Sequence, residues 1–150
     1  MDYDGLCARI RALTVGETDT VALMATVVCE VHHSHPSADW TGFYRVVGPE
    51  LLKIGPYQGG HGCLVIPFSR GVCGAAARMG RVLNVPDVAA FADHIACSST
   101  TKSELVLPVW NAAGVLLGVL DLDSDTPAAF TDADEAALVP LLAEVFAAAA

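Results

Sequence analysis

Two apolar segments near the C-terminus contain carboxylates, and this pattern constrains the fold more than any other feature of the chain. The run 114–124 (GVLLGVLDLDS) has the composition of a strand, in which successive side chains point to opposite faces. One face is predicted to carry Leu117, Val119, Asp121 and Asp123. The other is predicted to carry Leu116, Gly118, Leu120 and Leu122. Acids are rarely buried without a partner, and two of them roughly 7 Å apart raise each other's pKa unless solvent or a cation intervenes.

A second strand brings another acid to the same place. Glu104 begins the segment 103–110 (SELVLPVW), and the short polar turn Asn111 to Gly114 joins it to the first strand as a hairpin. Three acids are therefore expected to line one pocket suited to a positively charged ligand. Two simpler interpretations stay open: Asp121 and Asp123 lie where the strand emerges into solvent, and Glu104 caps a loop.

Three cysteines occur in separate segments around these acids: Cys63 in GCLVIP, Cys73 in RGVCGAA and Cys97 in DHIACSS. Nucleophilic sulfur beside unpaired acids suggests an active site. Cysteine is often buried for packing alone, and we assign Cys7 and Cys29, on predicted helices, to that role. For Cys73 the first turn of a helix would lower the thiol pKa, whereas its Gly-Ala neighbours indicate tight packing.

Length and charge limit the classes of function. A chain of 150 residues with 53% hydrophobic content is expected to form one domain, residues 1–150. A net charge of −9 with eight Lys and Arg and no basic cluster argues against nucleic acid or an anionic membrane as partner. The acidic start MDYDGLCARIRAL and the lack of a long apolar run predict a cytoplasmic protein. No CxxC pair or zinc-finger spacing occurs, so we expect no metal and no cofactor.

The pattern along the chain predicts an α+β fold with helices at both ends and a mainly antiparallel sheet between them. The expected helices span 4–13, 18 or 19 to 32, 72–79 and a final one capped by Thr131. The expected strands are 40–47, 51–54, 63–68, 82–85 and the hairpin described above. Residues 86–103 form a long segment without periodicity, which is often functional. His32, His33 and His35 end a helix and are predicted to be solvated rather than metal ligands.

These segments resemble the GAF-domain free methionine (R)-sulfoxide reductases. The similarity runs over nearly the whole chain, through GETD, DWTGFY, LKIGPYQG, IPFSRGVCGAA, DHIAC, SELVLPV, GVLDLDS and FTDADEAAL. It implies a GAF fold, with a sheet of about six strands flanked by the terminal helices, and reduction of the free amino acid. It also implies a catalytic cysteine at Cys97, a resolving cysteine at Cys63, thioredoxin as reductant and a homodimer.

The residues themselves supply what sulfoxide reduction requires. A Cys97 thiolate would attack the sulfoxide sulfur and become a sulfenic acid, which Cys63 or Cys73 would condense into a disulfide. Glu104 is the favoured proton donor, and Asp121 and Asp123 the favoured site for the substrate ammonium.

Other groups would shape the pocket. Trp40 and Tyr44 lie on either side of Gly42 on one strand face, where they could form an aromatic wall beside the methyl group. His61 and His94 flank the cysteines in sequence and are further candidates for proton transfer. Two other classes of function share this fold: a non-catalytic GAF module that binds a small ligand, and a thiol redox sensor in which Cys63 and Cys97 form a disulfide without a substrate.

Overall fold

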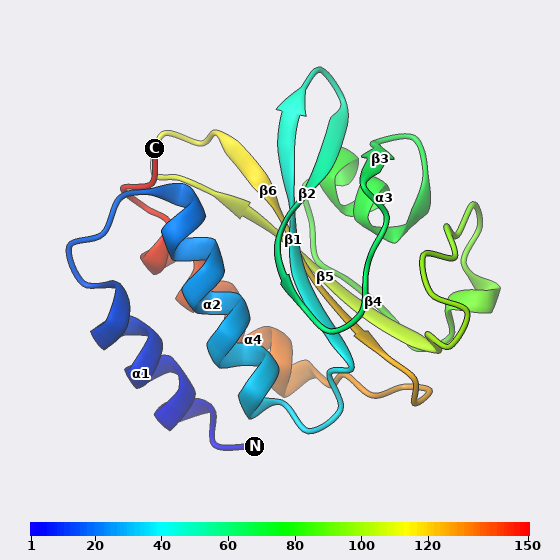
Figure 1. The fold of residues 1–150 in the computed structure, drawn as a ribbon, viewed down its shortest axis with the longest axis horizontal. Coiled ribbons are helices and arrows are strands. Elements are labelled where there is room, and N and C mark those ends of the chain that lie inside the picture. The colour runs from blue at the N-terminus through cyan, green and yellow to red at the C-terminus, as the bar shows by residue number, and fades with distance from the viewer.

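The computed structural model describes residues 1–150 and contains one six-stranded sheet (Figure 1). The strands are β1 (Trp40–Gly48), β2 (Leu51–Gln58), β3 (Val65–Pro67), β4 (Leu83–Val85), β5 (Ser103–Trp110) and β6 (Leu116–Ser124). Their order across the sheet is β3-β2-β1-β6-β5-β4, and every neighbouring pair is antiparallel. The predicted α+β architecture with a mainly antiparallel sheet of about six strands is confirmed.

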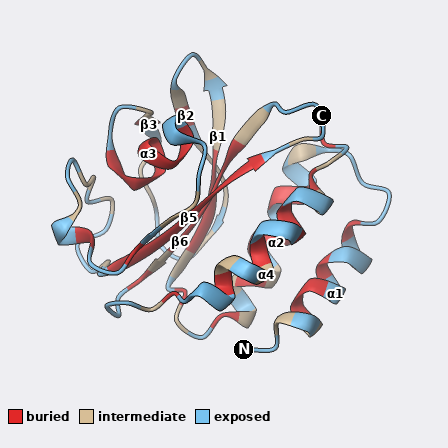
Figure 2. Cartoon of the chain, turned by 180° about the vertical axis from the view of Figure 1, so that it is seen from behind, coloured by how far each residue is buried: buried red, intermediate tan, exposed pale blue.

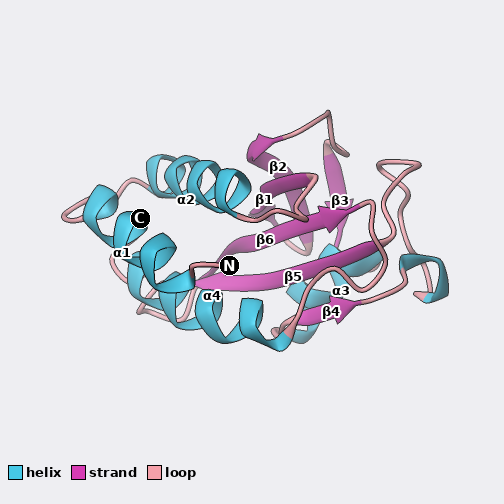
Figure 3. Ribbon diagram, turned by 90° about the horizontal axis from the view of Figure 1, so that it is seen from below, coloured by secondary structure: helices cyan, strands magenta, loops and turns pink.

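Helices cover the two faces of the sheet unequally. The helices α1 (Tyr3–Thr14), α2 (Thr20–Ser34) and α4 (Asp132–Val145) pack together on one face, whereas α3 (Gly71–Met79) lies on the other (Figures 1 and 3). A short 3₁₀ turn, η1 (Val88–Ala90), interrupts the long segment after β4. None of the helices combines the length and apolar character that crossing a membrane requires.

The sheet separates two apolar cores, and the buried sides of the helices face it (Figure 2). On the three-helix side, Phe43, Leu120 and Leu122 pack with apolar residues of α1, α2 and α4. On the α3 side, Tyr44 and Val119 belong to a smaller core. The alternation predicted for β6 is therefore confirmed from Gly118 onward, because a strand that is buried on both faces divides its side chains between two cores.

The start of β6 departs from the predicted alternation. Val109 pairs with Gly118, but Trp110 pairs with Leu116, so Leu117 is an extra residue in β6. Such a bulge inverts the side-chain pattern before it. Leu117 accordingly packs toward the three-helix core and Leu116 toward the α3 core, the reverse of the prediction.

Element boundaries differ from the prediction mainly in β2 and β3. The expected strand 51–54 continues to Gln58, because it pairs with β1 as far as Thr41. The expected strand 63–68 is reduced to Val65–Pro67, and Cys63 lies in the preceding loop. The α4 start is as predicted, with a capping box in which Thr131 and Asp134 exchange hydrogen bonds.

The prediction that His35 is solvated is wrong. His35 is buried, and its Nε2 donates to Asp134 Oδ1 at 2.8 Å while its Nδ1 accepts from the Ser37 N–H at 3.2 Å. The Tyr3 hydroxyl donates to the same carboxylate oxygen at 2.6 Å. A buried imidazole needs such partners, and these join the starts of α1 and α4 to the end of α2.

We predict that Asp134→Ala lowers the free energy of unfolding by about 3 kcal/mol, because the buried His35 imidazole and the partly buried Tyr3 hydroxyl lose their acceptor. Burial raises the pKa of Asp134, but the hydrogen bonds from His35, Thr131 and Tyr3 outweigh it and leave the pKa below its usual range. A lowered pKa means that the ionised form stabilises the fold above pH ~4 and that this contribution is lost as pH falls further. Urea unfolding of both proteins at pH 7 and at pH 3 measures the effect.

The matched control is Asp132→Ala, an exposed acid in the same helical turn. It is expected to change stability by less than about 1 kcal/mol. A difference between wild type and Asp134→Ala that is as large at pH 3 as at pH 7 would contradict the assigned role of the carboxylate.

Candidate active site

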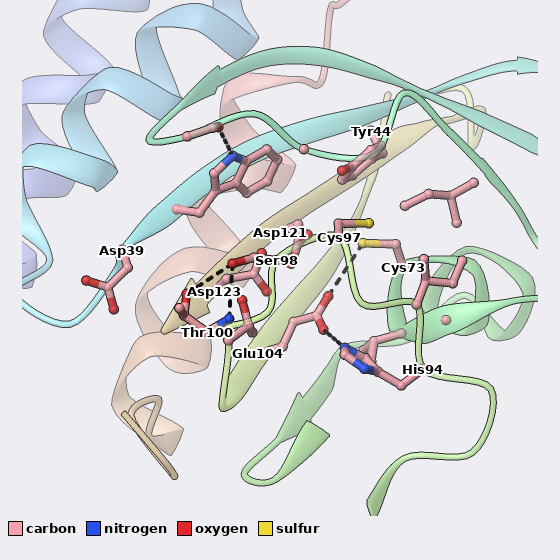
Figure 4. Close-up of a pocket in the computed structure, with 18 of the residues that line it drawn as sticks. Asp39, Tyr44, Cys73, His94, Cys97, Ser98, Thr100, Glu104, Asp121 and Asp123 are labelled. Carbon is pink, nitrogen blue, oxygen red and sulfur yellow. Dashed lines mark hydrogen bonds and ion pairs between the residues drawn. The ribbon is translucent and has the colours of Figure 1, made fainter. Parts of the chain in front are cut away.

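Cross-strand pairing places the three predicted acids together on the α3 side of the sheet. Glu104 on β5 lies directly opposite Asp123 on β6, and Asp123 in turn lies opposite Trp40 on β1. In the next row Asp121 lies opposite Gly42. Directly opposed residues of antiparallel strands have Cβ atoms about 5 Å apart, so the acids form one group. Figure 4 shows Glu104, Asp121 and Asp123 pointing into the same cavity.

The interpretation that the acids are solvent-facing or cap a loop is wrong for two of them. Glu104 is 6% exposed and Asp121 3% exposed, and both lie inside strands. Asp123 is partly buried, one residue before the strand end.

An aromatic wall closes one side of the cavity. The rings of Trp40 and Tyr44 stack at 5.9 Å between centroids, and the ring of Tyr57 also stacks with that of Trp40, at 5.5 Å. Gly42 lies between Trp40 and Tyr44, and any side chain there would collide with the Trp40 ring. The glycine therefore leaves room for the indole to lie along the sheet, on the face that Trp40 and Tyr44 were predicted to share.

Two loops bring the cysteines to this wall. The loop after β2 is fixed by a hydrogen bond from Trp40 Nε1 to the Gly60 carbonyl at 2.8 Å, and it carries Cys63. The long loop before β5 is fixed to α3 by the Gly71 N–H, which donates to the Asp93 carbonyl at 3.0 Å, and it carries Cys97.

Cys63 and Cys97 are joined by a disulfide with their Cα atoms 5.2 Å apart, within the usual range for such bonds. The bond closes a loop across residues that are 34 apart in sequence. Cys73 is a free, buried thiol in the first turn of α3.

The cavity has a volume of about 290 Å³. This is at the lower end of the range for small-molecule sites, ~300–1,000 Å³, and suits a ligand of amino-acid size. Its lining contains the carboxylates Asp39, Glu104, Asp121, Asp123 and Asp125 together with Cys73 and Cys97, and no Lys or Arg.

Burial without a cation shifts the acids toward their neutral forms. Burial raises the pKa of Glu104 to about 7. Burial, and then the charges of Asp123 and Glu104, raise the pKa of Asp121 well above its usual value. Burial and Glu104 raise the pKa of Asp123 in the same way. A positively charged ligand group would restore the ionised forms, because opposite charges lower carboxyl pKa values.

Cys73 is linked to this group of acids. Its Sγ donates to Glu104 Oε1 at 3.7 Å, and burial followed by the charges of Asp121 and Glu104 raises its pKa well above the usual value. The expectation that the helix start would lower the thiol pKa is therefore wrong, because burial beside acids outweighs the helix dipole.

The sequence-predicted residues gather at one place, with differences in detail. All eight border the cavity or are bonded to a residue that does: Trp40, Tyr44, Cys63, Cys73, Cys97, Glu104, Asp121 and Asp123. Of the two candidate histidines, His94 lies 4.0 Å from Glu104 Oε2 and His61 lines the rim. Of the cysteines assigned to packing, Cys7 is buried but Cys29 is exposed.

Sequence reasoning missed several lining residues. Asp39 accepts a hydrogen bond from the Asp125 N–H at 2.7 Å at one edge of the cavity. Ser98, Thr100 and Thr101 bring hydroxyl groups to the lining beside Cys97. The run of hydroxyl residues directly after that cysteine was the one pattern that could have indicated them.

The antiparallel sheet has three helices on one face and a ligand-sized cavity beside α3 on the other, an arrangement consistent with a GAF domain, and the GAF domain family model matches residues 9–150. Among similar proteins, Protein YtsP of Bacillus subtilis is 42% identical over 89% of this chain and 82% of its own length. The free methionine-R-sulfoxide reductase of Escherichia coli is 38% identical over 95% of this chain and 86% of its own.

A solved structure agrees in fold. The free methionine-R-sulfoxide reductase of Neisseria meningitidis in complex with its substrate has a TM-score of 0.90 and 39% identity, over 97% of this chain and 89% of that one. The chain therefore belongs to the GAF-domain family that includes the free methionine-R-sulfoxide reductases.

We predict that Glu104→Gln changes the free energy of unfolding more favourably at pH 8 than at pH 5, and that the two changes differ by on the order of 2 kcal/mol. A raised folded pKa means that Glu104 opposes folding increasingly as pH rises from ~4 through about 7, where the buried carboxyl ionises. Glutamine has the same shape and cannot ionise. Urea unfolding at both pH values measures the difference.

The exposed acid Glu50 provides the control. Glu50→Gln should give the same change in stability at the two pH values, within about 0.5 kcal/mol. Equal pH dependence of wild type and Glu104→Gln would show that Glu104 does not titrate in this range.

Proposed function

We propose that the protein reduces free L-methionine (R)-sulfoxide to L-methionine. The observation that carries the proposal is the Cys63–Cys97 disulfide at a cavity whose other walls are buried acids and the Trp40–Tyr44 stack. The relatives named free methionine-R-sulfoxide reductase support it, since two of them match 95% and 97% of the chain.

The acids would hold the charged end of the substrate. Asp121 and Asp123 lie in a cavity without Lys or Arg, so the substrate ammonium would be the cation that pairs with their negative charges. A methionine sulfoxide inside a polypeptide has no such charge, which explains selectivity for the free amino acid. The Trp40 and Tyr44 rings would take the methyl group and exclude water.

The chemical step would take place between Cys97 and the sulfoxide. The Cys97 thiolate attacks the sulfoxide sulfur, and Glu104 donates a proton to the sulfoxide oxygen. The S–O bond of the substrate then breaks as the hydroxyl passes to the Cys97 sulfur, so methionine leaves and Cys97 becomes a sulfenic acid. Glu104, with a pKa of about 7, would hold that proton near neutral pH. Sulfur in the substrate is reduced by two electrons and Cys97 is oxidised by two.

The thiol would then be regenerated. Cys63 attacks the sulfenic acid, water leaves, and the Cys63–Cys97 disulfide forms. The disulfide in the structure supports Cys63 rather than Cys73 as the resolving thiol. A dithiol such as that of thioredoxin would reduce the bond and complete the cycle.

Four further elements belong to the proposal: thioredoxin as physiological reductant, a homodimer, a cytoplasmic location and a single domain over residues 1–150. They are supported by the resemblance to the reductase family, by the match of the GAF model to residues 9–150 and by the acidic composition. Sedimentation or light scattering measures the stoichiometry.

We predict that the free R epimer drives NADPH consumption coupled through thioredoxin and thioredoxin reductase, whereas the S epimer and a peptide-bound sulfoxide do not. Cys97→Ser should abolish even a single turnover, because the attacking sulfur is gone. Cys63→Ser should release one equivalent of methionine and then stop. Quantifying methionine per enzyme in the absence and presence of thioredoxin distinguishes these outcomes.

The exposed Cys29 supplies the control, and Cys29→Ser should retain the wild-type rate. No turnover with the R epimer would reject the enzyme in favour of a ligand-binding module or a thiol sensor. Normal cycling of Cys63→Ser would move the resolving role to Cys73.

We predict that Asp121→Asn and Asp123→Asn each raise KM for the free sulfoxide by about 10-fold or more, since each loses a charge-assisted contact to the ammonium. N-acetyl-methionine sulfoxide, which has no ammonium, should be a poor substrate for the wild type and should be affected little by either substitution. The control is the exposed Asp132→Asn. Unchanged KM in both cavity variants would show that the ammonium binds elsewhere.

A further inference from the structure

Three ligand atoms from separate elements converge at the bottom of the cavity. Cys73 Sγ from α3, a Glu104 oxygen from β5 and an Asp121 oxygen from β6 all lie within 4.8 Å of one another. The separation of Cys73 Sγ from Glu104 Oε1 is 3.7 Å, close to the edge of a tetrahedron around a zinc ion that binds sulfur at about 2.3 Å and oxygen at about 2.0 Å. Figure 4 shows the contact between Cys73 and Glu104.

One oxygen of the Asp121 carboxylate lacks a hydrogen-bond partner in the protein. Asp121 is 3% exposed, and its Oδ1 is the one buried side-chain polar atom without a hydrogen bond. A buried carboxylate oxygen without a donor is costly, so the fold holds a strong acceptor ready for a ligand.

The electrostatics of the cavity favour a cation. Its lining includes five carboxylates and two histidines but no Lys or Arg. All three residues line the cavity, as does His94, whose Nε2 lies 4.0 Å from Glu104 Oε2. Sulfur, carboxylate and imidazole ligands together are typical of Zn²⁺ and Co²⁺ rather than of Mg²⁺ or Ca²⁺.

We propose that Cys73, Glu104 and Asp121 form a binding site for Zn²⁺, with the fourth position open to the cavity and within reach of His94. Binding displaces the Cys73 proton to solvent and leaves a thiolate on the metal. The site does not need the other cavity cysteines, because the disulfide that removes both of them is present in the same structure.

The metal and the substrate exclude each other. Asp121 cannot hold a substrate ammonium and a zinc ion at once, and Glu104 bound to a metal cannot donate a proton. Zn²⁺ bound to these residues therefore inhibits sulfoxide reduction by the reduced protein, and this consequence rests on the proposed function. The metal site itself does not.

The test uses Co²⁺ as a spectroscopic substitute for Zn²⁺, with the full chain in its disulfide form. Mass spectrometry first verifies the Cys63–Cys97 bond, which leaves Cys73 as the only thiol in the cavity. We expect one equivalent of Co²⁺ to give a sulfur-to-cobalt charge-transfer band in the near ultraviolet and the intense visible bands of a tetrahedral ion. Added Zn²⁺ should remove both.

Matched variants assign the ligands. Cys73→Ser should lose the charge-transfer band, and Glu104→Gln and Asp121→Asn should each weaken Co²⁺ binding at least 10-fold. Cys29→Ser is the control, because the exposed Cys29 lies 3.9 Å from His33 Nδ1 and is the alternative place for a metal on this chain. That variant should bind as the wild type does. Circular dichroism verifies that each variant is folded.

The outcomes are decisive. The proposal is overturned if the disulfide form shows no charge-transfer band, if the band persists in Cys73→Ser, or if it disappears in Cys29→Ser. If Cys73→Ser does not fold, the two carboxylate variants decide, and unchanged affinity in both overturns the site.

A second titration separates the metal site from the proposed function. Free methionine sulfoxide should displace Co²⁺ and remove the band, whereas the N-acetyl derivative should not. If Co²⁺ binds but the sulfoxide does not displace it, the metal site is supported, and the proposal that metal and substrate share Asp121 and Glu104 is rejected. Cobalt that binds to a protein without reductase activity would reject the proposed function alone.

Discussion

The burial of Glu104 and Asp121 on one face of a sheet is the constraint on which the cavity depends. Neither acid has a Lys or Arg partner in the lining, so packing apolar side chains over them would leave unpaired charge in a low-dielectric interior. The α3 side of the sheet therefore stays hollow where β5 and β6 carry acids. A positively charged ligand would offset the free-energy cost of burying these acids. The burial that destabilises the fold therefore also favours binding of a cation.

The opposite face of the sheet provides the stability that this arrangement requires. Large apolar residues of the strands pack there against α1, α2 and α4, and the Asp134 network ties the ends of these helices together. The division follows from strand alternation, because Leu120 and Leu122 point to the helices while Asp121 points to the cavity. Residues that stabilise the scaffold and residues of the site thus alternate along one strand.

Much of this division could be predicted because it is local. Alternation in 118–123 assigned the two faces, and the turn at 111–114 placed Glu104 beside the other acids. The rest depends on contacts between distant segments. Nothing near His35 in sequence indicates that Asp134, 99 residues away, is its partner. The bulge at Leu117 likewise depends on pairing with β5, which the composition of β6 alone does not encode.

The same electrostatics separate the roles of the three cavity cysteines. Cys73 is buried beside Glu104 and Asp121, which raise the pKa of its thiol, so near neutral pH it is a hydrogen-bond donor and a poor nucleophile. Attack on a sulfenic acid requires a thiolate that can reach the sulfur. The disulfide shows that the Cys63 sulfur can reach that of Cys97. Only a cation at the acids would ionise Cys73. In the proposed reaction the substrate ammonium would be a transient cation, whereas a bound metal ion would hold the Cys73 thiolate in place. The same acids would then assist turnover with the first cation and block it with the second.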